Sequence, residues 1–390
     1  MKPSEAPLIA VFGHDAAEST LRKRIASFQD QGWRVAGFTF TRPKTASTPA
    51  IFWHDTPLGR TRDRNYARRL PALAAAVPRI LRRAETLRAA RVLYARNIDM
   101  LALAVLAKRL TGSRARVVYE VLDVQRPFAR GDAAGAALRA AERRLLARTD
   151  LLVVSAPDFV TRYFEPVQGF EGPWRLLENK LAAHQIAAAP EAFARETAHP
   201  PLDGPIVIGW FGVLRCTRSL DLLQAIATRL GPRVRIVLRG RLSEEDISAA
   251  RLEAALRRTP NLAFGGPYAS PDDLRGVYGA IHFAWALDYT DAGANSDWLL
   301  PNRLYEGGYF GVPALARAGT ATGRRVEERG LGHALPEPAD EAACTLIENL
   351  DAQAYARLRA TILAQPHGAF VDETDTAALL AELAEAEARP

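Results

Sequence analysis

Short apolar runs alternate with segments of helical periodicity along most of the chain. The first run, at residues 8–13, contains no charge, and residues 21–33 then carry apolar side chains at helical spacing. Further apolar runs recur at residues 34–40, 92–95, 117–122 and 151–155. Because strands buried on both faces of a parallel sheet are continuously apolar, this alternation predicts a doubly wound α/β domain.

The same pattern starts again in the second half of the chain. A polar stretch with four prolines, residues 188–205, interrupts it, and apolar runs then follow at residues 206–212, 234–240, 262–265 and 281–286. We therefore expect two Rossmann-like domains. The predicted division is an N-terminal domain over residues 1–185, a linker over 186–205, a second domain over 206–370 and a terminal helix in 371–390.

The composition agrees with a two-domain globular protein. The chain has 390 residues, of which 48% are hydrophobic and 24% charged, and no apolar run approaches the ~20 residues needed to span a bilayer. The N-terminus has no signal-peptide pattern. The two cysteines, Cys216 and Cys344, lie far apart and have no metal-ligand spacing, so we expect a protein of the reducing cytoplasm.

Candidate site residues follow the predicted strands. In open parallel sheets, ligands bind outside the carboxyl ends of the strands. The polar or glycine-containing positions that come directly after a strand are Gly13, His14, Asp15, Asp123, residues 212–218, Gly240, Arg241 and Asp288.

The most specific local pattern spans residues 300–316. Pro301 suits the first turn of a helix, Gly311 its C-terminal cap and Pro313 the exit into a strand. Asn302, Arg303 and Glu306 then lie on the first turns, where backbone N–H groups attract anions and a carboxylate can accept two hydrogen bonds from a ribose diol. The alternative is an ordinary capped helix with an exposed glutamate.

A second pattern, residues 209–219, joins a strand to a helix through Gly212. The glycine allows close backbone approach, and Arg215 and Arg218 can neutralise a diphosphate. The alternative is a surface turn with solvated arginines. The chain has no Asp-x-Asp motif placed to hold a metal, so these cations and the helix start at Asn302 are expected to take the leaving diphosphate without one.

Two aspartates of the first domain are candidates for a general base. Asp123 ends a buried run and Asp15 follows the first strand; either could also be a helix cap or a turn residue. His14 is either a site residue or a turn histidine. In the second domain, Tyr268 and Asp288 could flank a nucleotide, and Trp285 is expected in the core.

The segment 301–313 resembles the proline–asparagine–lysine–hydrophobic–glutamate signature of GT-B glycosyltransferases, followed by their glycine–valine–proline exit. The resemblance implies that Glu306 holds the donor ribose. Many members carry a second glutamate eight residues earlier, where this chain has Trp298; Asp297 and residues 295–296 are the nearest polar candidates. Residues 209–219 are similar to the opening of the donor domain in the same family.

The resemblance covers most of the chain and is nearest to transferases of succinoglycan-like or xanthan-like exopolysaccharide assembly. It implies two domains facing across a cleft, with the acceptor on the first and a nucleotide-diphosphate sugar, expected to be a UDP-sugar, on the second. It also implies that the terminal helix returns to the first domain, and it favours Asp123 over Asp15 as the base. The implied reaction is sugar transfer to a lipid-linked or polysaccharide acceptor, with no cofactor.

A basic segment suggests where this reaction takes place. Residues 60–91 hold ten arginines against Asp63 and Glu85, with apolar residues at helical spacing. A basic amphipathic helix is typical of membrane-surface elements, so we expect a peripheral protein on the inner face of the plasma membrane. The alternative is a solvated helix packed on the first domain. Nucleic acid is not an expected partner, because only Tyr66 interleaves with the arginines and no nucleic-acid module is present.

Two other functions fit part of the pattern. A sugar-nucleotide epimerase of GT-B shape would need no acceptor and no membrane segment, so the basic segment disfavours it. A non-catalytic scaffold derived from a transferase would be expected to lose Glu306 or the Arg215–Arg218 pair, and both are present.

Overall fold

The computed structural model describes residues 6–42, 50–61, 66–195 and 199–385. The chain divides into two compact units: unit 1 holds the residues up to Glu178 and those from Glu373 onward, and unit 2 holds Asn179–Asp372. The segment that we expected to be a linker lies within unit 2, where it forms α8 (Ala183–Ala188) and the 3-10 turn η2 (Pro190–Phe193). Phe193 is buried there and packs against the rings of Tyr309 and Phe310, which ties this proline-bearing stretch to unit 2.

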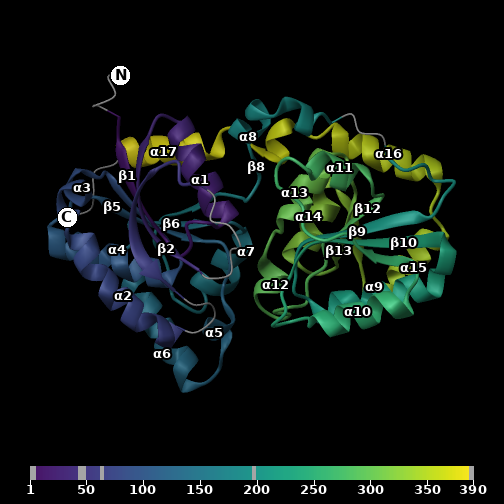
Figure 1. Cartoon of the computed structure of the whole chain (residues 1–390), viewed down its shortest axis with the longest axis horizontal. Helices are drawn as coiled ribbons and strands as arrows, with labels where there is room; N and C mark the ends of the chain where they lie inside the picture. Colours follow the sequence, from purple (N-terminus) through teal and green to yellow (C-terminus); the bar gives the residue numbers. More distant parts are fainter. Residues whose placement is uncertain (1–5, 43–49, 62–65, 196–198, 386–390) are drawn as a thin grey trace. The chain divides into compact units, whose positions relative to one another are not determined.

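Unit 1 is built on a parallel sheet that, in the described residues, has seven strands in the order β3-β2-β1-β4-β5-β6-β7 (Figure 1). The strands are β1 (Leu8–Gly13), β2 (Arg34–Thr41), β3 (His54–Arg60), β4 (Val92–Arg96), β5 (Arg116–Val121), β6 (Leu151–Val154) and β7 (Trp174–Leu176). The two edge strands, β3 and β7, were not predicted from the sequence. All of β7 is exposed and β3 buries only Leu58, so neither strand has the continuous apolar run of a central strand.

Helices cover both faces of this sheet. They are α1 (Ser19–Asp30), α2 (Tyr66–Leu81), α3 (Ala84–Ala89), α4 (Ile98–Thr111), α5 (Arg126–Ala129), α6 (Ala133–Leu146), α7 (Pro157–Phe159), the π-helical turn η1 (Val160–Phe164) and α17 (Asp375–Glu385). Figure 1 shows α17, in yellow, near α1 and β1. Leu379 and Leu383 of α17 join Ile25 and Phe28 of α1 in one buried cluster, so the end of the chain completes the core of unit 1.

Unit 2 has a second parallel sheet, in the order β11-β10-β9-β12-β13-β14. Its strands are β9 (Ile206–Leu214), β10 (Val234–Leu242), β11 (Leu262–Phe264), β12 (Phe283–Trp285), β13 (Ala314–Arg317) and β14 (Gly332–Leu335). A separate parallel pair joins β8 (Leu181–Ala182) to β15 (Val371–Asp372). Trp285 has no exposed surface and lies in the core of this unit, as expected.

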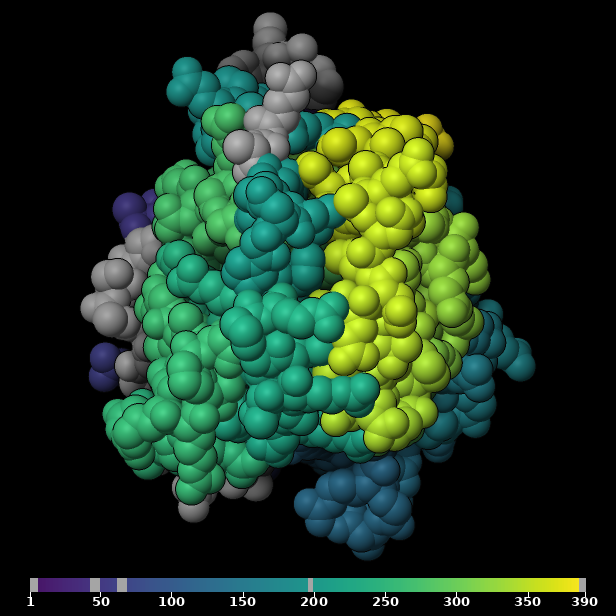
Figure 2. Space-filling model, turned by 90° about the vertical axis from the view of Figure 1, so that its right-hand side faces the viewer, coloured from purple at the N-terminus to yellow at the C-terminus, as the bar shows by residue number. Residues whose placement is uncertain are grey.

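The helices of unit 2 complete its layers. They are α9 (Thr217–Leu230), α10 (Ala249–Arg258), α11 (Leu274–Gly279), α12 (Asn295–Trp298), α13 (Asn302–Tyr309), α14 (Ala321–Arg329), α15 (Ala339–Glu348) and α16 (Ala352–Leu363), with the 3-10 turns η3 (Gly231–Arg233) and η4 (His367–Ala369). Figure 2 looks onto the α16 end, where the yellow C-terminal part of unit 2 forms a strip beside teal and green segments. Tyr355 of α16 anchors this strip, because its hydroxyl donates to the carbonyl of His282 at 3.0 Å.

Both sheets reverse their strand order once. The reversal lies between β1 and β4 in unit 1 and between β9 and β12 in unit 2. This is the arrangement of doubly wound sheets, so the predicted α/β class is confirmed. Ligands of such sheets bind at the carboxyl ends of the strands beside the reversal, which fixes where a site is expected in each unit.

Candidate active site

Glu306 lies on α13, the helix predicted from the sequence pattern. Pro301 is the N-cap of this helix, one position before the predicted first turn, and Gly311 follows the end with a φ of +72°. The hydroxyl of Tyr278, on α11, donates to Glu306 Oε2 at 2.8 Å. Burial, Glu306 and Tyr268 raise the pKa of Tyr278 well above its ordinary value, so this hydroxyl keeps its proton and holds the carboxylate as a donor.

Tyr268 and Arg303 lie close to the same carboxylate. Burial raises the pKa of Tyr268, the negative charge of Glu306 raises it further, and Arg303 and Arg239 oppose this. Arg239 is held by the carbonyls of Gly266 and Pro267, at 3.3 and 3.1 Å. A tyrosine, a carboxylate and two guanidiniums therefore gather around the start of α13, and Nη1 of Arg303 is buried without a hydrogen-bond partner among the described residues.

Arg215 faces Asp288, the polar residue that follows β12. The distance from Arg215 Nη2 to Asp288 Oδ2 is 3.6 Å. Burial would raise the pKa of Asp288, but Arg215, the hydrogen bonds of Thr290 and the charge of Arg303 hold it below its ordinary value. Asp288 is thus an anion that lies beside Arg215, one of the two arginines predicted to bind a diphosphate, and within the electrostatic reach of Arg303.

Arg218, the second arginine of the predicted pair, has different partners. Its guanidinium lies over the ring of Tyr289, 4.4 Å from the centroid, and Nη2 is 3.1 Å from Glu337 Oε2. Arg317 lies over the same ring at 4.8 Å and pairs with Asp297, the residue beside Trp298. The structure therefore links Asp297 to an arginine at the end of β13.

Gly212 differs from its predicted place in a turn, since β9 continues to Leu214. Its φ is +104°, and an added Cβ would meet nothing within 4 Å, so the surface beside it is open. Gly240 pairs with it on β10 and has a φ of +127°; a Cβ there would meet the carbonyl of Gly212 at 1.9 Å. Both positions require glycine, so no side chain covers the backbone of β9 and β10 near the point where the strand order reverses.

Asn302, at the first position of α13, accepts a hydrogen bond from the side chain of Asn179 at 2.6 Å. Asn179 is the first residue of unit 2, so this hydrogen bond connects the beginning of the unit to the start of the candidate donor helix. Together these contacts bring Glu306, Arg303, Tyr268, Asp288 and Arg215 into one region of unit 2, whereas Arg218 belongs to the neighbouring Tyr289 cluster.

Asp123 is exposed, two residues beyond β5, and lines a small cavity of about 10 Å³. Asn97 and Gln125 line the same cavity, together with the inner residues Tyr119, Glu142 and Tyr163. A volume of this size holds about one water molecule.

One of the inner residues of this cavity, Glu142, is a buried carboxyl that no sequence pattern marked. Tyr119 and Tyr163 donate to the two oxygens of Glu142 at 3.0 and 2.5 Å, and Gln168 donates at 2.6 Å. Burial raises the pKa of Glu142 despite these bonds. Tyr163 lies on the π-helical turn η1, a local geometry that periodicity does not reveal.

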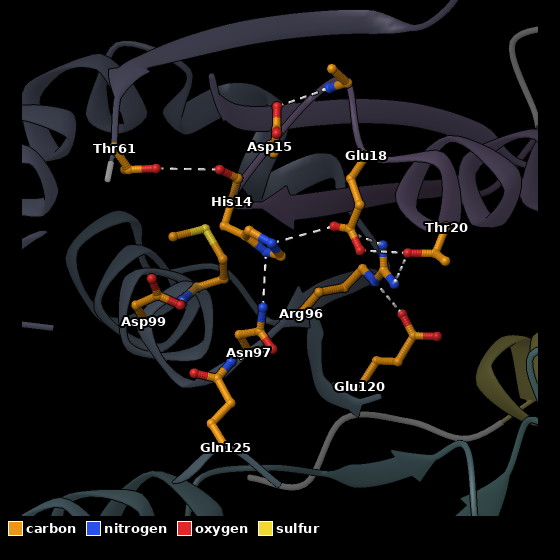
Figure 3. Close-up of polar contacts among 12 residues, drawn as sticks. His14, Asp15, Glu18, Thr20, Thr61, Arg96, Asn97, Asp99, Glu120 and Gln125 are labelled. Carbon is orange, nitrogen blue, oxygen red and sulfur yellow. Dashed lines mark hydrogen bonds and ion pairs between the residues drawn. The ribbon is translucent and has the colours of Figure 1, made fainter. Parts of the chain in front are cut away.

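Asp15 is a turn residue in this structure. It is partly buried, and its Oδ1 accepts from the backbone N–H of Ala17 at 3.1 Å (Figure 3). His14 is buried beside it, and burial lowers the pKa of His14 to about 4, against the opposite effect of Glu18. The imidazole is therefore neutral near pH 7.

A chain of buried ion pairs supports the reversal point of unit 1. Glu120 of β5 pairs with Arg24 of α1 at 3.1 Å and with Arg96 of β4 at 2.6 Å. Arg96 also lies 3.7 Å from Glu18, which is 3.4 Å from His14 (Figure 3). The pairs that Glu120 and Arg96 make join β4, β5 and α1, and they were not identified from sequence, because each connects residues distant along the chain.

The basic segment, residues 60–91, begins at the last residue of β3 and contains the helices α2 and α3. Arg62 and Arg64 lie outside the described residues, as does the side chain of Arg68. Arg69 is buried and pairs with Asp99 at 2.8 Å, so it has a structural partner. Arg82 and Arg83 are exposed.

The described residues show neither a metal-binding cluster nor a membrane-spanning helix. They contain no group of three or more His, Cys, Asp or Glu side chains that could hold a metal ion. They also contain no helix of the length and apolarity needed to cross a bilayer.

The fold matches known glycosyltransferase structures. Anabaena HepE in complex with UDP and glucose aligns with a TM-score of 0.71 and 15% identity, covering 97% of this chain and 99% of that one. Sucrose-phosphate synthase from Thermosynechococcus elongatus aligns with a TM-score of 0.71 and 16% identity, over 97% and 98%. The lipopolysaccharide outer core galactosyltransferase WaaB aligns at 0.66 and 13%, over 96% and 99%. The protein has the GT-B fold.

A curated relative defines the family. The succinoglycan biosynthesis protein ExoL of Rhizobium meliloti (strain 1021) is 37% identical over 378 residues, which cover 96% of this chain and 93% of ExoL. No protein-family model matches the chain. The chain belongs to the family of ExoL, the exopolysaccharide-assembly glycosyltransferases of the GT-B type, and the resemblance found in its sequence is confirmed.

Proposed function

We propose that this enzyme moves a sugar from a UDP-sugar, bound by unit 2, to a lipid-linked glycan bound by unit 1. The observation that carries the proposal is the cluster at the start of α13, where Glu306 lies beside Tyr278, Tyr268 and Arg303. The structural relative HepE was solved with UDP and with UDP-glucose, which supports a uridine nucleotide as the donor.

In the proposed donor site, the charged residues bind different parts of the UDP-sugar. Glu306, oriented by Tyr278, accepts hydrogen bonds from the two ribose hydroxyls, and Tyr268 flanks the nucleoside. Arg303 and Arg215, beside Asp288, neutralise the diphosphate, helped by the N–H groups at Asn302 and by the bare backbone at Gly212. Arg218 contributes from the Tyr289 cluster. These cations stabilise the UDP leaving group in a reaction that uses no metal ion.

In unit 1, Asp123 acts as the general base on the acceptor hydroxyl. It is exposed at the carboxyl end of β5, whereas Asp15 already holds a backbone N–H as part of a turn. An exposed carboxylate at a strand end is accessible to an acceptor hydroxyl at hydrogen-bond distance. Asp15 remains the rival residue for this role.

In this proposal, the enzyme binds its lipid-linked acceptor at the cytoplasmic face of the plasma membrane. α2 packs on α4, and the two helices expose Leu70 and Leu110, whose side chains are 62% and 51% accessible. Arg82, Arg83 and Arg109 are exposed on or just beyond the same helices. Apolar side chains that can insert, together with arginines, fit an anionic lipid surface.

The proposed function is tested with purified enzyme, UDP-glucose as the first donor, and phytanyl-diphosphate-linked glucose oligosaccharides as acceptors. UDP and the UDP-sugar should raise the melting temperature, because a ligand that binds only the folded state stabilises it. Glu306→Ala should remove this shift with little change in the melting temperature of the free protein. A matched control is Glu373→Ala, in unit 1. If neither UDP nor any UDP-sugar shifts the transition at millimolar concentration, the donor assignment is wrong.

A further inference from the structure

Asn97 has a backbone conformation that residues other than glycine rarely adopt. It follows β4, beside the strand reversal of unit 1, with φ +73° and ψ 160°. Among the described residues it is the one non-glycine residue with positive φ. This region of backbone angles is almost exclusive to glycine, and residues held there cluster at functional sites.

The capping of α4, the helix that follows, does not explain why this residue is an asparagine. Asn97 is the N-cap of α4, where its side chain would ordinarily accept from a backbone N–H, but it makes no such bond. Glycine would adopt the same backbone angles without strain. We therefore infer that the side chain of Asn97, and not its backbone conformation, explains why an asparagine occupies this position.

Two neighbours hold the Asn97 side chain in place (Figure 3). Its Nδ2 lies 2.9 Å from His14 Nδ1, and its Oδ1 accepts from Gln125 Nε2 at 3.5 Å. His14 Nε2 faces the Glu18 carboxylate at 3.4 Å, so the ring hydrogen lies on Nε2 and Nδ1 is the acceptor. These contacts fix which end of the amide is the donor.

The amide retains hydrogen-bonding capacity after these contacts. The second hydrogen on Nδ2 and a second lone pair on Oδ1 have no partner among the described residues. One donor and one acceptor side by side match a hydroxyl group, which also donates and accepts. Asn97 is partly exposed and lines the same small cavity as Asp123, the proposed base.

We propose that Asn97 binds a hydroxyl of the acceptor glycan beside Asp123, and that His14 and Gln125 are positioning residues that orient the Asn97 amide. The inference rests on the proposed function, in which unit 1 holds the acceptor. It gives His14 the task of a neutral hydrogen-bond acceptor and leaves proton removal to Asp123.

The experiment compares Asn97→Gly with wild type, using UDP-glucose and the phytanyl-diphosphate-linked oligosaccharides. Glycine keeps the backbone angles and removes only the amide, so the melting temperature should not fall. The acceptor KM should rise roughly tenfold or more through the lost hydrogen bonds, while the melting shift produced by UDP stays the same. Asn349→Gly, at the end of α15 in unit 2, controls for the change of residue type.

Two variants of His14 separate positioning from catalysis. In His14→Asn, the side-chain oxygen replaces Nδ1 as the acceptor for Asn97, so the acceptor KM should stay within about threefold of wild type; in His14→Leu it should rise. A general base at this position would instead lose roughly 100-fold or more in kcat in both variants.

Each result decides the inference. An acceptor KM for Asn97→Gly within twofold of wild type, with active wild-type enzyme, overturns the role of Asn97 and leaves the proposed function standing. Equal losses of kcat in His14→Asn and His14→Leu overturn the role of His14. Wild-type enzyme that transfers no sugar from any UDP-sugar overturns the proposed function and this inference with it.

Discussion

Replacing Glu120 with glutamine tests whether the buried ion pairs of unit 1 stabilise its fold. Glu120 is 1% exposed, and its two oxygens lie 3.1 Å from Arg24 Nε and 2.6 Å from Arg96 Nε. Both guanidiniums are buried as well. Glutamine keeps the shape of the side chain but removes the charge that balances two cations in a medium of low dielectric constant.

The expected cost follows from what each arginine retains. Removing one partner of a buried ion pair costs about 3–5 kcal/mol, because the other charge is left uncompensated. After the change Arg96 keeps Glu18 at 3.7 Å, and Arg24 keeps the hydroxyl of Thr376 at 3.2 Å. We therefore expect the lower end of the range, about 3 kcal/mol, which for a unit of about 200 residues lowers the melting temperature by roughly 6–12 °C.

The assay is differential scanning calorimetry of the full chain near pH 7. Glu171→Gln, at an exposed position before β7, is the matched control and should change stability by less than about 0.5 kcal/mol. The transition of unit 2 should stay in place in both variants. If the unfolding free energy of Glu120→Gln lies within about 1 kcal/mol of wild type, the charge of Glu120 adds no net stability and the reasoning is refuted.

Four further outcomes are expected. Tyr278→Phe, which removes the hydroxyl held 2.8 Å from Glu306, should weaken UDP binding by about 1.5–3 kcal/mol in isothermal titration; unchanged affinity would show that the carboxylate needs no orientation. Asp123→Asn should abolish transfer while UDP still binds, and Asp15→Asn should retain it; the reverse result exchanges their roles. Burial raises the pKa of Glu18, but Arg96 and His14 lower it to about 2. The folding stability that the ionised carboxylate contributes is therefore present above about pH 4.5 and should be lost as the pH falls toward 2. Glu18→Gln should lose less stability over this range, and equal acid sensitivity of the two proteins would contradict the assignment. Liposome flotation with anionic lipid at low salt should be weakened by about 3 kcal/mol, and so lost, when Arg82, Arg83 and Arg109 become glutamine. It should be kept when Arg241, Arg257 and Arg258 are changed instead; flotation of both variants would exclude this surface.

Local sequence patterns were enough for the fold class and for the candidate donor helix. Central strands of a parallel sheet are buried on both faces and apolar along most of their length, so β1, β2 and β9 are visible in the sequence. The proline, glycine and glutamate of residues 301–313 act on their own helix, which explains why its bounds were found to within one residue. The edge strands β3 and β7 of unit 1 were missed, because they bury too little to need an apolar run.

Contacts between residues distant in sequence were decided by the tertiary structure alone. Nothing in the sequence around Tyr278 indicates that it orients Glu306, and nothing around Arg69 indicates that Asp99 removes it from the solvated basic face. The position of Asn97 after an apolar strand was a signal, but its backbone angles and its contact with His14 depend on β1 and β4 lying side by side. Sequence periodicity reports whether a residue faces the core or solvent, whereas its partners are set by which elements the sheet order brings together.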